Sequence, residues 1–378
     1  MSKKVLFYYQ PNKKSISLIS QALILEKRGF QVYLLTVDPN GKLHQDMEKI
    51  HIANFSCPWR SKNSVLNYLF LSLYLIYFSY RYRIDFILAH LHVPCFTAGL
   101  AQFFILSKCI FFRHNSSLWN DEDLYKQDIN PNERRLDKWI NNLAKEIVVP
   151  SEGVKNYMIT NEKVDKNRIQ VLHYIYDFEF YPMPNKSKVR EIQSKYKSSL
   201  LMVMISRMVK HKRHQVVFEA IHEMIKNGFD IKLMVLDSGP ELKCLQQYVY
   251  KNSLQEHIIF IGYIDNPTDY MKAADILIQP SMTDASNSVS KEMGYLSKPV
   301  MVSDGVGDYS EYIIHGVNGI LLPIHNTKNH ITKEIRSIFE GGYNLEKLGI
   351  ELKKTILEKF SKANLENEYK EFIDKNLG

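Results

Sequence analysis

The stretch of sequence that decides the fold is AADILIQPSMTDASNSVSKEMGY, residues 273–295. Its apolar beginning predicts a buried strand at Ile276–Gln279, and the Pro-Ser pair that follows ends this strand. A polar loop then leads into a helix that is expected to begin near Ser286 or Asn287, because small and N-capping residues gather there. A strand that runs through a loop into a helix is the repeating unit of an α/β fold with a parallel sheet.

The start of this helix is a candidate phosphate site. Several backbone N–H groups there lack an intrahelical acceptor, and together with the helix dipole they favour an anion. Asp284 precedes the helix and Glu292 lies inside it. Because a carboxylate repels phosphate but binds sugar hydroxyls, the segment predicts a nucleotide-sugar site. An ordinary crossover with solvated carboxylates is the alternative that the segment alone leaves open. The candidate donor-binding residues are Ser286, Asn287, Ser288 and Val289.

Length and composition predict a soluble protein of two domains. The chain has 378 residues, of which 45% are hydrophobic and 24% are charged, so a folded core is expected. The four cysteines form no metal-binding or disulfide pattern, and the apolar run near the N-terminus is too short for a signal peptide. Both observations favour the cytoplasm. A net charge of +8 favours anionic partners, but nucleic acid is not expected because no motif for it is present.

The beginning of the chain predicts the opening of a doubly wound sheet. Apolar strands are expected at 5–9 and 31–37, and the helix between them is expected to end at Gly29. The loop after the first strand carries Lys13 and Lys14, which either hold a phosphate or are solvated.

The most apolar run of the chain, residues 65–80, has two interpretations. As a helix it is roughly 24 Å long at about 1.5 Å per residue, shorter than the ~30 Å hydrocarbon core of a membrane. A buried helix of the first domain is the favoured interpretation. Because large apolar residues occupy nearly all faces of this helix, a helix that lies in a membrane interface stays open as the alternative.

Three histidines of the first half lie near the ends of expected strands. His90 and His92 close one strand, and because they are two positions apart they are expected to share a face, where they either line a binding site or bind a metal. No third ligand follows from the spacing, so a metal is not favoured. His114 comes just after the strand 110–113, at the edge where open α/β sheets bind ligands. The acidic run 121–123 is interpreted as a solvated loop.

Two basic residues follow the first expected strand of the second half. After the strand Leu200–Ile205, Arg207 and Lys212 lie five positions apart in a loop that leads into a helix. Two fixed cations at such a place stabilise negative charge, for example that of a diphosphate. The alternative is an ordinary basic loop in a protein with surplus positive charge.

These segments resemble the retaining glycosyltransferases of family 4. That family has two acidic residues separated by seven positions, after a Pro-Ser pair and before a Gly-Lys-Pro-Val turn. Here the pattern reads Pro280, Ser281, Asp284, Glu292 and Ser297–Val300. Asp284 replaces the usual glutamate, and the glycine pair usual in the first loop is absent. The resemblance covers nearly the whole chain and is strongest from residue 200 to residue 322.

The resemblance implies a GT-B fold, an α/β fold of two Rossmann-like domains that face each other across a cleft. It implies transfer of a hexose from a nucleotide diphosphate sugar with retention of configuration, without a metal or another cofactor. The expected domains are an acceptor-side domain, 1–181, and a donor-binding domain, 198–360, joined by a linker, 182–197. A C-terminal helix, 361–378, is expected to cross back to the first domain.

The family also implies roles for individual residues. Arg207 and Lys212 would neutralise the leaving diphosphate, and Glu292 would bind the ribose. Asp284 and His114 would contact the donor sugar. The other donor-binding residues implied by the match are Tyr263, which would stack on the base, and Gly239, in a segment like the family's Gly-Pro-Glu turn.

The acceptor is expected to be a glycan or a lipid-linked glycan. Basic charge and the apolar run 65–80 point to an anionic membrane surface, as in bacterial surface polysaccharide assembly at the inner face of the cytoplasmic membrane. Two other functions stay open: a non-catalytic subunit of the same fold, and a peripheral membrane interaction protein.

Overall fold

The computed structural model describes residues 2–12, 15–59, 63–114, 131–178 and 181–378. The chain divides into two compact units, each with its own sheet. Unit 1 consists of Met1–Phe180 with Phe360–Gly378, and unit 2 consists of Tyr181–Lys359.

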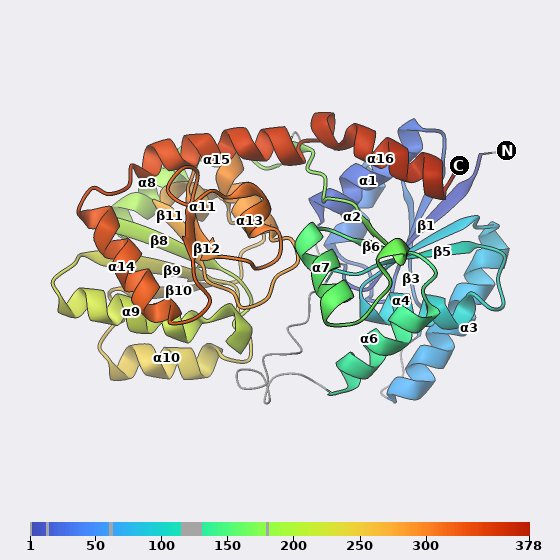
Figure 1. Cartoon of the computed structure of the whole chain (residues 1–378), viewed down its shortest axis with the longest axis horizontal. Coiled ribbons are helices and arrows are strands. Elements are labelled where there is room, and N and C mark those ends of the chain that lie inside the picture. The colour runs from blue at the N-terminus through green and yellow to red at the C-terminus, as the bar shows by residue number, and fades with distance from the viewer. Residues whose placement is uncertain (1, 13–14, 60–62, 115–130, 179–180) are drawn as a thin grey trace. The chain divides into compact units, whose positions relative to one another are not determined.

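Unit 1 is a parallel sheet of the order β3-β2-β1-β4-β5-β6-β7 with helices on both faces (Figure 1). Its central strands are apolar on both sides, as buried parallel strands are, and Val5–Tyr8 of β1 are completely buried. The strands are β1 (Lys4–Tyr9), β2 (Gln31–Thr36), β3 (Ala53–Ser56), β4 (Phe86–His90), β5 (Lys108–Phe112), β6 (Ile147–Val149) and β7 (Ile169–Val171). The helices are α1 (Ile16–Lys27), α2 (Lys42–Lys49), α3 (Ser64–Tyr82), α4 (His92–Ala101), α6 (Pro131–Leu143), α7 (Glu152–Thr160) and α16 (Lys362–Asn376).

The last helix of the chain, α16, belongs to unit 1. Its Tyr369, Phe372 and Ile373 are buried in the hydrophobic core that also contains β1 and α1. At its start, Lys362 Nζ pairs with Asp177 Oδ2 at 2.6 Å. The C-terminal helix is therefore part of the core of unit 1.

The apolar run 65–80 forms helix α3, and neither interpretation describes it completely. Leu71, Leu75 and Phe78 are buried against the unit, whereas Leu69 and Leu73 on the other side are about half exposed. No helix that the structure describes is long and apolar enough to cross a membrane.

Unit 2 is a second parallel sheet, of the order β10-β9-β8-β11-β12-β13, also with helices on both faces (Figure 1). Helix α9 shows why such helices form, because its Val217, Phe218, Ile221 and Met224 recur at helical spacing and are completely buried. The strands are β8 (Leu200–Ile205), β9 (Ile231–Leu236), β10 (Ile258–Gly262), β11 (Ile276–Gln279), β12 (Val300–Ser303) and β13 (Ile320–Leu322). The helices are α8 (Lys186–Lys195), α9 (His214–Lys226), α10 (Leu242–Lys251), α11 (Thr268–Ala273), α12 (Ser288–Tyr295), α13 (Tyr309–Tyr312), α14 (Thr327–Phe339) and α15 (Leu345–Phe360).

The stretch 182–197, predicted to be a linker, contains helix α8 and belongs to unit 2. Asn185 caps this helix by accepting from two of its amides, and the amide of Asn185 donates to Asp269 Oδ1 at 2.7 Å. Ile192 is the one residue of α8 that is buried. This helix has few apolar residues and several lysines, which is why its sequence resembles a linker.

Candidate functional site

Two loops lie side by side at one edge of the unit 2 sheet. Strands β8 and β11 are neighbours, but the chain continues from them in opposite directions across the sheet. The carboxyl ends of two such strands form the switch point at which open α/β sheets bind ligands. Loop 206–213 follows β8 and loop 280–287 follows β11, and the Met282 amide donates to the carbonyl oxygen of His211 at 2.8 Å. The predicted cations and the predicted carboxylate therefore lie on adjoining loops.

Lys212 and Asp284 form an ion pair between these loops. Lys212 Nζ lies 2.8 Å from Asp284 Oδ2, and the two side chains are 15% and 16% exposed. The same carboxylate oxygen accepts from Asn287 Nδ2 at 3.0 Å and from the Tyr309 hydroxyl at 3.5 Å. A Cβ at Gly307 would lie 2.9 Å from the carbonyl oxygen of Asp284, so only glycine fits there. The Asp284 carboxylate is thus fixed between a cation and two neutral donors.

The other predicted cation, Arg207, is exposed. Its guanidinium makes no hydrogen bond or ion pair with the residues that the structure describes. Gly239 lies behind the same loop, where a Cβ would be 2.4 Å from the carbonyl oxygen of Met208. The Met208 amide in turn donates to the carbonyl oxygen of Ser238 at 2.9 Å. Gly239 therefore allows the close approach of two backbone segments that holds the Arg207 loop in place.

The start of helix α12 offers amides to an anion. Asn287 is the N-cap, and its side chain accepts from the Ser290 amide at 2.9 Å, which confirms the predicted start of the helix. The amides of Ser288 and Val289 lie in the first turn, where no intrahelical acceptor exists. The Ser286 side chain is used differently, because its hydroxyl donates to Asp308 at 2.7 Å. The predicted role of Ser286 in donor binding stays a prediction.

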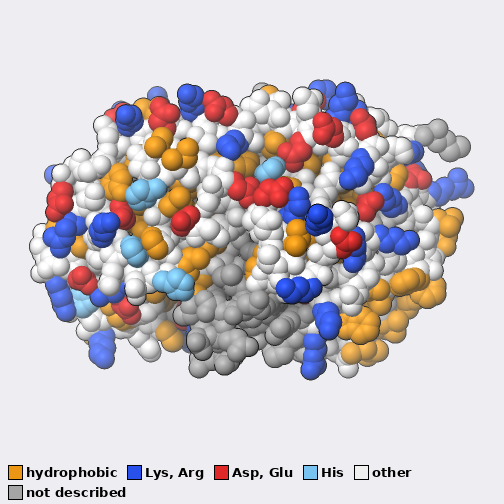
Figure 2. Space-filling model, viewed as in Figure 1, with side chains coloured by type: hydrophobic (Ala, Val, Ile, Leu, Met, Phe, Trp, Pro, Cys, Tyr) orange, Lys and Arg blue, Asp and Glu red, His pale blue; other side chains and the backbone are white. Residues whose placement is uncertain are grey.

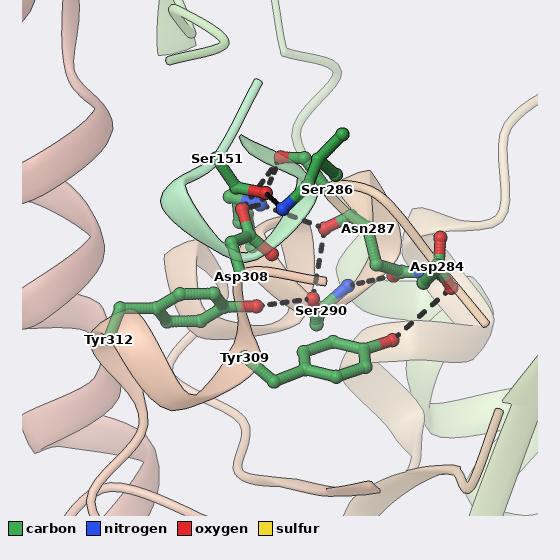
Figure 3. A network of polar contacts seen from close by, with 10 residues as sticks. Ser151, Asp284, Ser286, Asn287, Ser290, Asp308, Tyr309 and Tyr312 are labelled. Carbon is green, nitrogen blue, oxygen red and sulfur yellow. Dashed lines mark hydrogen bonds and ion pairs between the residues drawn. The ribbon is translucent and has the colours of Figure 1, made fainter. Parts of the chain in front are cut away.

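A buried ion pair that the sequence analysis missed lies beneath this loop. Lys291 Nζ is 2.6 Å from Asp308 Oδ2 and 2.9 Å from Ser286 Oγ, and the ring of Tyr312 faces the same ammonium at 5.0 Å. Figure 3 shows how Asp308 and Tyr312 meet the loop and the first turn of α12. The Tyr312 hydroxyl also hydrogen-bonds Ser290 at 2.7 Å. Seventeen positions separate Lys291 from Asp308, so no local spacing rule indicates the pair.

Glu292, the second carboxylate, is half-buried on α12. Its Oε2 accepts a hydrogen bond from the Tyr181 hydroxyl at 3.0 Å. The buried Tyr181 ring packs edge-on against Tyr295, with the ring centroids 5.6 Å apart. Tyr181 was expected to end the first domain, but it belongs to unit 2. It is a further residue of the site that the sequence analysis missed, because it lies 111 positions from its partner.

Tyr263 follows strand β10 at the same edge of the sheet, with β9 between β10 and β8. Its ring is 59% exposed, so a planar group can reach it. The predicted stacking on a base stays a prediction.

In unit 1, His114 follows β5 and is held by two neighbours. Its Nε2 lies 2.9 Å from His90 Nδ1, and its Nδ1 hydrogen-bonds the Tyr174 hydroxyl. Burial, together with the nearby charges of His92 and Arg113, lowers the pKa of His114 to about 3. His114 is therefore neutral at neutral pH, and it can bind a ligand through a ring nitrogen only when one of these two hydrogen bonds opens.

The expectation that His90 and His92 share one face of a strand is wrong. Strand β4 ends at His90, Leu91 turns the chain with a φ of 72°, and His92 begins helix α4. His92 Nε2 lies 2.9 Å from Asp137 Oδ1, which also pairs with the buried Arg113 at 3.1 Å. Within the described ranges, no group of three histidine, cysteine or acidic side chains is placed to hold a metal. The acidic run 121–123 and the lysines at 13 and 14 lie outside those ranges.

Two family models match the chain in succession. Residues 17–180 match Glycosyltransferase Family 4, and residues 185–355 match Glycosyl transferases group 1.

Curated relatives match at low identity. The capsular polysaccharide biosynthesis glycosyltransferase CapM of Staphylococcus aureus is 21% identical over 62% of this chain, which spans only 64% of CapM's length. A Campylobacter jejuni enzyme, N-acetylgalactosamine-N,N'-diacetylbacillosaminyl-diphospho-undecaprenol 4-alpha-N-acetylgalactosaminyltransferase, is 21% identical over 82% of both chains.

Solved structures confirm the predicted GT-B fold. Anabaena Alr3699/HepE in complex with UDP-glucose superposes with a TM-score of 0.80 at 16% identity, and the match covers 98% of this chain and 99% of that one.

Proposed function

Because the chain belongs to the family 4 glycosyltransferases, we propose that it transfers a hexose from a nucleotide diphosphate sugar to a glycan or a lipid-linked acceptor. The observation that carries this proposal is the pairing of Lys212 with Asp284 beside the start of α12, at the switch point of the unit 2 sheet. A cation and helix amides suit a diphosphate, whereas a fixed carboxylate suits the hydroxyls of a sugar. The site thus offers both halves of a nucleotide sugar a matching partner.

The charge of each residue determines its proposed role in donor binding. Arg207 and Lys212 neutralise the leaving diphosphate together with the amides of Ser288 and Val289. Glu292 accepts from the ribose hydroxyls. Asp284 and His114 are the proposed contacts of the donor sugar, and Tyr263 is that of the base.

We propose that the reaction retains the anomeric configuration and needs no metal. The bond from the anomeric carbon to the diphosphate oxygen breaks, and the bond to the acceptor oxygen forms on the same face. The acceptor's proton goes to the departing phosphate. Protein cations, Arg207 and Lys212, supply the positive charge that a metal supplies in other transferases.

Two relatives and the charge of the chain support a proposal for the acceptor and the location. The names of the two curated relatives refer to capsular polysaccharide and to a diphospho-undecaprenol glycan. We propose a related place for this chain, in surface polysaccharide assembly at the inner face of the cytoplasmic membrane. A net charge of +8 supports an anionic membrane surface as a partner.

A thermal-shift screen tests the donor site. The diphosphates of uridine, guanosine and cytidine and their sugar conjugates are added to the full chain. A ligand at 100 times its Kd stabilises by about 2.7 kcal/mol, which raises the melting temperature by about 5–10 °C. Stabilisation by one nucleotide series is expected. If none of these nucleotides and conjugates stabilised the chain, the non-catalytic subunit would be the better interpretation.

Turnover is then measured with the stabilising donor. Release of the nucleotide diphosphate is expected to continue in excess EDTA, and NMR of the product is expected to show the donor's anomeric configuration. Loss of turnover in EDTA that manganese restores would contradict the role given to Arg207 and Lys212.

A further inference from the structure

Helix α3 carries an outward face of large apolar side chains. Leu66, Leu69, Leu73, Tyr77 and Tyr80 recur every three or four positions, so they lie on one side of the helix. Their exposed fractions are 46%, 51%, 52%, 58% and 57%. Single exposed apolar residues are common, but a continuous row of them marks a surface that meets an apolar partner.

The apolar face continues beyond α3. The Tyr80 hydroxyl donates to the carbonyl oxygen of Phe104 at 2.8 Å, which ties the helix to the loop after α4. In that loop Phe103, Phe104 and Leu106 are 70%, 67% and 94% exposed. Figure 2 shows hydrophobic side chains gathered over the region of α3 that Figure 1 labels. We call the surface formed by the exposed residues of this set the apolar face; they are Leu66, Leu69, Leu73, Tyr77, Tyr80, Phe103, Phe104 and Leu106.

A cavity opens beside the apolar face. It has a volume of about 290 Å³ and is lined by residues 57–59, which follow β3, and by Phe70, Leu71, Leu73 and Tyr74 of α3. Trp59 is 61% exposed and packs edge-on against Phe70, with the ring centroids 4.5 Å apart. The lining is almost wholly apolar. A cavity of this size and chemistry accepts a stretch of hydrocarbon.

Charge decides what kind of partner fits. The segment from Cys57 to Ile84 contains three arginines and one lysine but no aspartate or glutamate. At the end of α3, Arg81 and Arg83 are exposed beside the apolar row. An apolar face with exposed cations at the end of its helix matches a lipid layer, in which hydrocarbon lies beneath anionic head groups.

We propose that the apolar face enters the hydrocarbon edge of a lipid membrane and that the cavity beside Trp59 holds part of a lipid chain. The proposal takes from the proposed function only the membrane as a partner, and sugar transfer is not needed for it. It adds the surface that inserts, the side chains that do so and a binding site for hydrocarbon.

Fluorescence quenching tests the insertion. A variant with Trp119→Phe and Trp139→Phe keeps Trp59 as its only tryptophan. Neutral phosphatidylcholine vesicles at high salt remove the electrostatic attraction, and bromine midway along one acyl chain quenches only a ring that enters the hydrocarbon. Quenching of Trp59 by brominated vesicles, relative to unbrominated ones, is the expected result. Binding without quenching would overturn the proposal.

Substitutions in the row test the surface. Two half-exposed leucines that leave water change partitioning about 30-fold, so Leu69→Ser with Leu73→Ser is expected to weaken vesicle binding by about that factor. Ile350→Ser is the matched control, because Ile350 is 53% exposed in unit 2. An unchanged melting temperature in both variants shows that the fold is intact. Equal loss of binding in the control would contradict the proposal.

Two further measurements separate the proposals. Sedimentation tests a protein partner: a dimer that the double serine variant dissociates, with no binding to vesicles, would identify the face as a protein interface and overturn the lipid site. Quenching together with an inert donor site would overturn the proposed sugar transfer and leave the lipid site standing. Sugar transfer without quenching of Trp59 would overturn the lipid site and leave the proposed sugar transfer standing.

Discussion

The ammonium of Lys291 lies 2.6 Å from Asp308 Oδ2, and the two side chains are 0% and 1% exposed. Burial raises the pKa of Asp308, and the Lys291 charge opposes this rise. Ser286 donates to the same carboxylate oxygen. Buried ion pairs add little net stability, but losing one partner leaves an expensive unpaired charge. The pair therefore holds the loop before α12 in one arrangement.

Removing one charge of this pair is expected to destabilise unit 2. Asp308→Asn leaves the Lys291 ammonium buried without its carboxylate, at a cost of about 3–5 kcal/mol. The double variant Lys291→Met with Asp308→Asn is expected to recover most of this loss, which urea unfolding measures. Asp304→Asn, at an exposed position nearby, serves as the control. A double variant with the summed loss of the two single variants would show that the pair is not coupled.

The two cations of the site are expected to behave differently. Arg207 is exposed, so Arg207→Ala is expected to leave the melting temperature nearly unchanged and to weaken binding of the nucleotide diphosphate about 10- to 150-fold. Lys212→Ala removes the partner of Asp284 and is expected to lower both the melting temperature and the affinity for the nucleotide diphosphate. Calorimetric titration and thermal melts measure the two effects. Lys210, an exposed lysine of the same loop, provides the control. An equal loss of affinity in Lys210→Ala would show that the affinity depends on the positive charge of the loop in general and not on Arg207 and Lys212.

The sequence predicts those parts of the molecule that follow from local rules. Apolar runs with turn residues after them placed β8 and β11, and N-capping residues placed the start of α12 at Asn287. The resemblance to the family assigned Lys212 and Asp284 to one donor site, and the structure brings them together because the loops of a parallel sheet meet at one edge.

What the sequence did not predict depends on tertiary packing. Lys291 and Asp308 come together because α12 and the turn after β12 close on each other, and Tyr181 reaches Glu292 from 111 positions away. His92 was misplaced because a single backbone angle at Leu91 ended the strand. None of these contacts leaves a pattern along the chain.

Acid is expected to weaken unit 2 through His214. Burial, and then the Lys212 charge, lower the pKa of His214 from 6.5 to about 4. Between these values the unfolded chain binds a proton that the folded chain does not, so stability falls as the pH falls. From pH 7 to pH 5 the loss is about 2 kcal/mol. Urea unfolding at both values is expected to show a smaller loss in His214→Gln than in His325→Gln, an exposed control. Equal losses would contradict this role of His214.

Anionic lipid is expected to strengthen membrane binding beyond what the apolar face supplies. A basic residue near an anionic surface contributes about 1 kcal/mol, or about fivefold, and salt screens this contribution. Arg81→Gln is therefore expected to weaken binding to anionic vesicles about fivefold at low salt and hardly at all at high salt. Lys226→Gln, exposed in unit 2, is the control. Equal partitioning into neutral and anionic vesicles, unaffected by salt, would remove the electrostatic contribution.

The last prediction separates the function of Glu292 from its structural role. Glu292→Gln keeps an oxygen that can accept from the Tyr181 hydroxyl, so the fold is expected to survive with a nearly unchanged melting temperature. It removes the negative charge. Hydrogen bonds to charged groups are worth roughly 1.5–3 kcal/mol, so donor affinity or turnover is expected to fall about 10- to 150-fold.

Two companion variants show whether this loss belongs to the nucleotide sugar. Tyr181→Phe removes the hydroxyl but leaves the Glu292 charge, so it is expected to retain much more activity than Glu292→Gln. Asp284→Asn is expected to weaken binding of the sugar conjugate more than that of the free nucleotide diphosphate, because Asp284 is proposed to contact the sugar. Two outcomes would mean that Glu292 acts by holding Tyr181 and not by binding the donor. One is full transfer activity in Glu292→Gln, and the other is a loss of activity in Tyr181→Phe as large as the loss in Glu292→Gln.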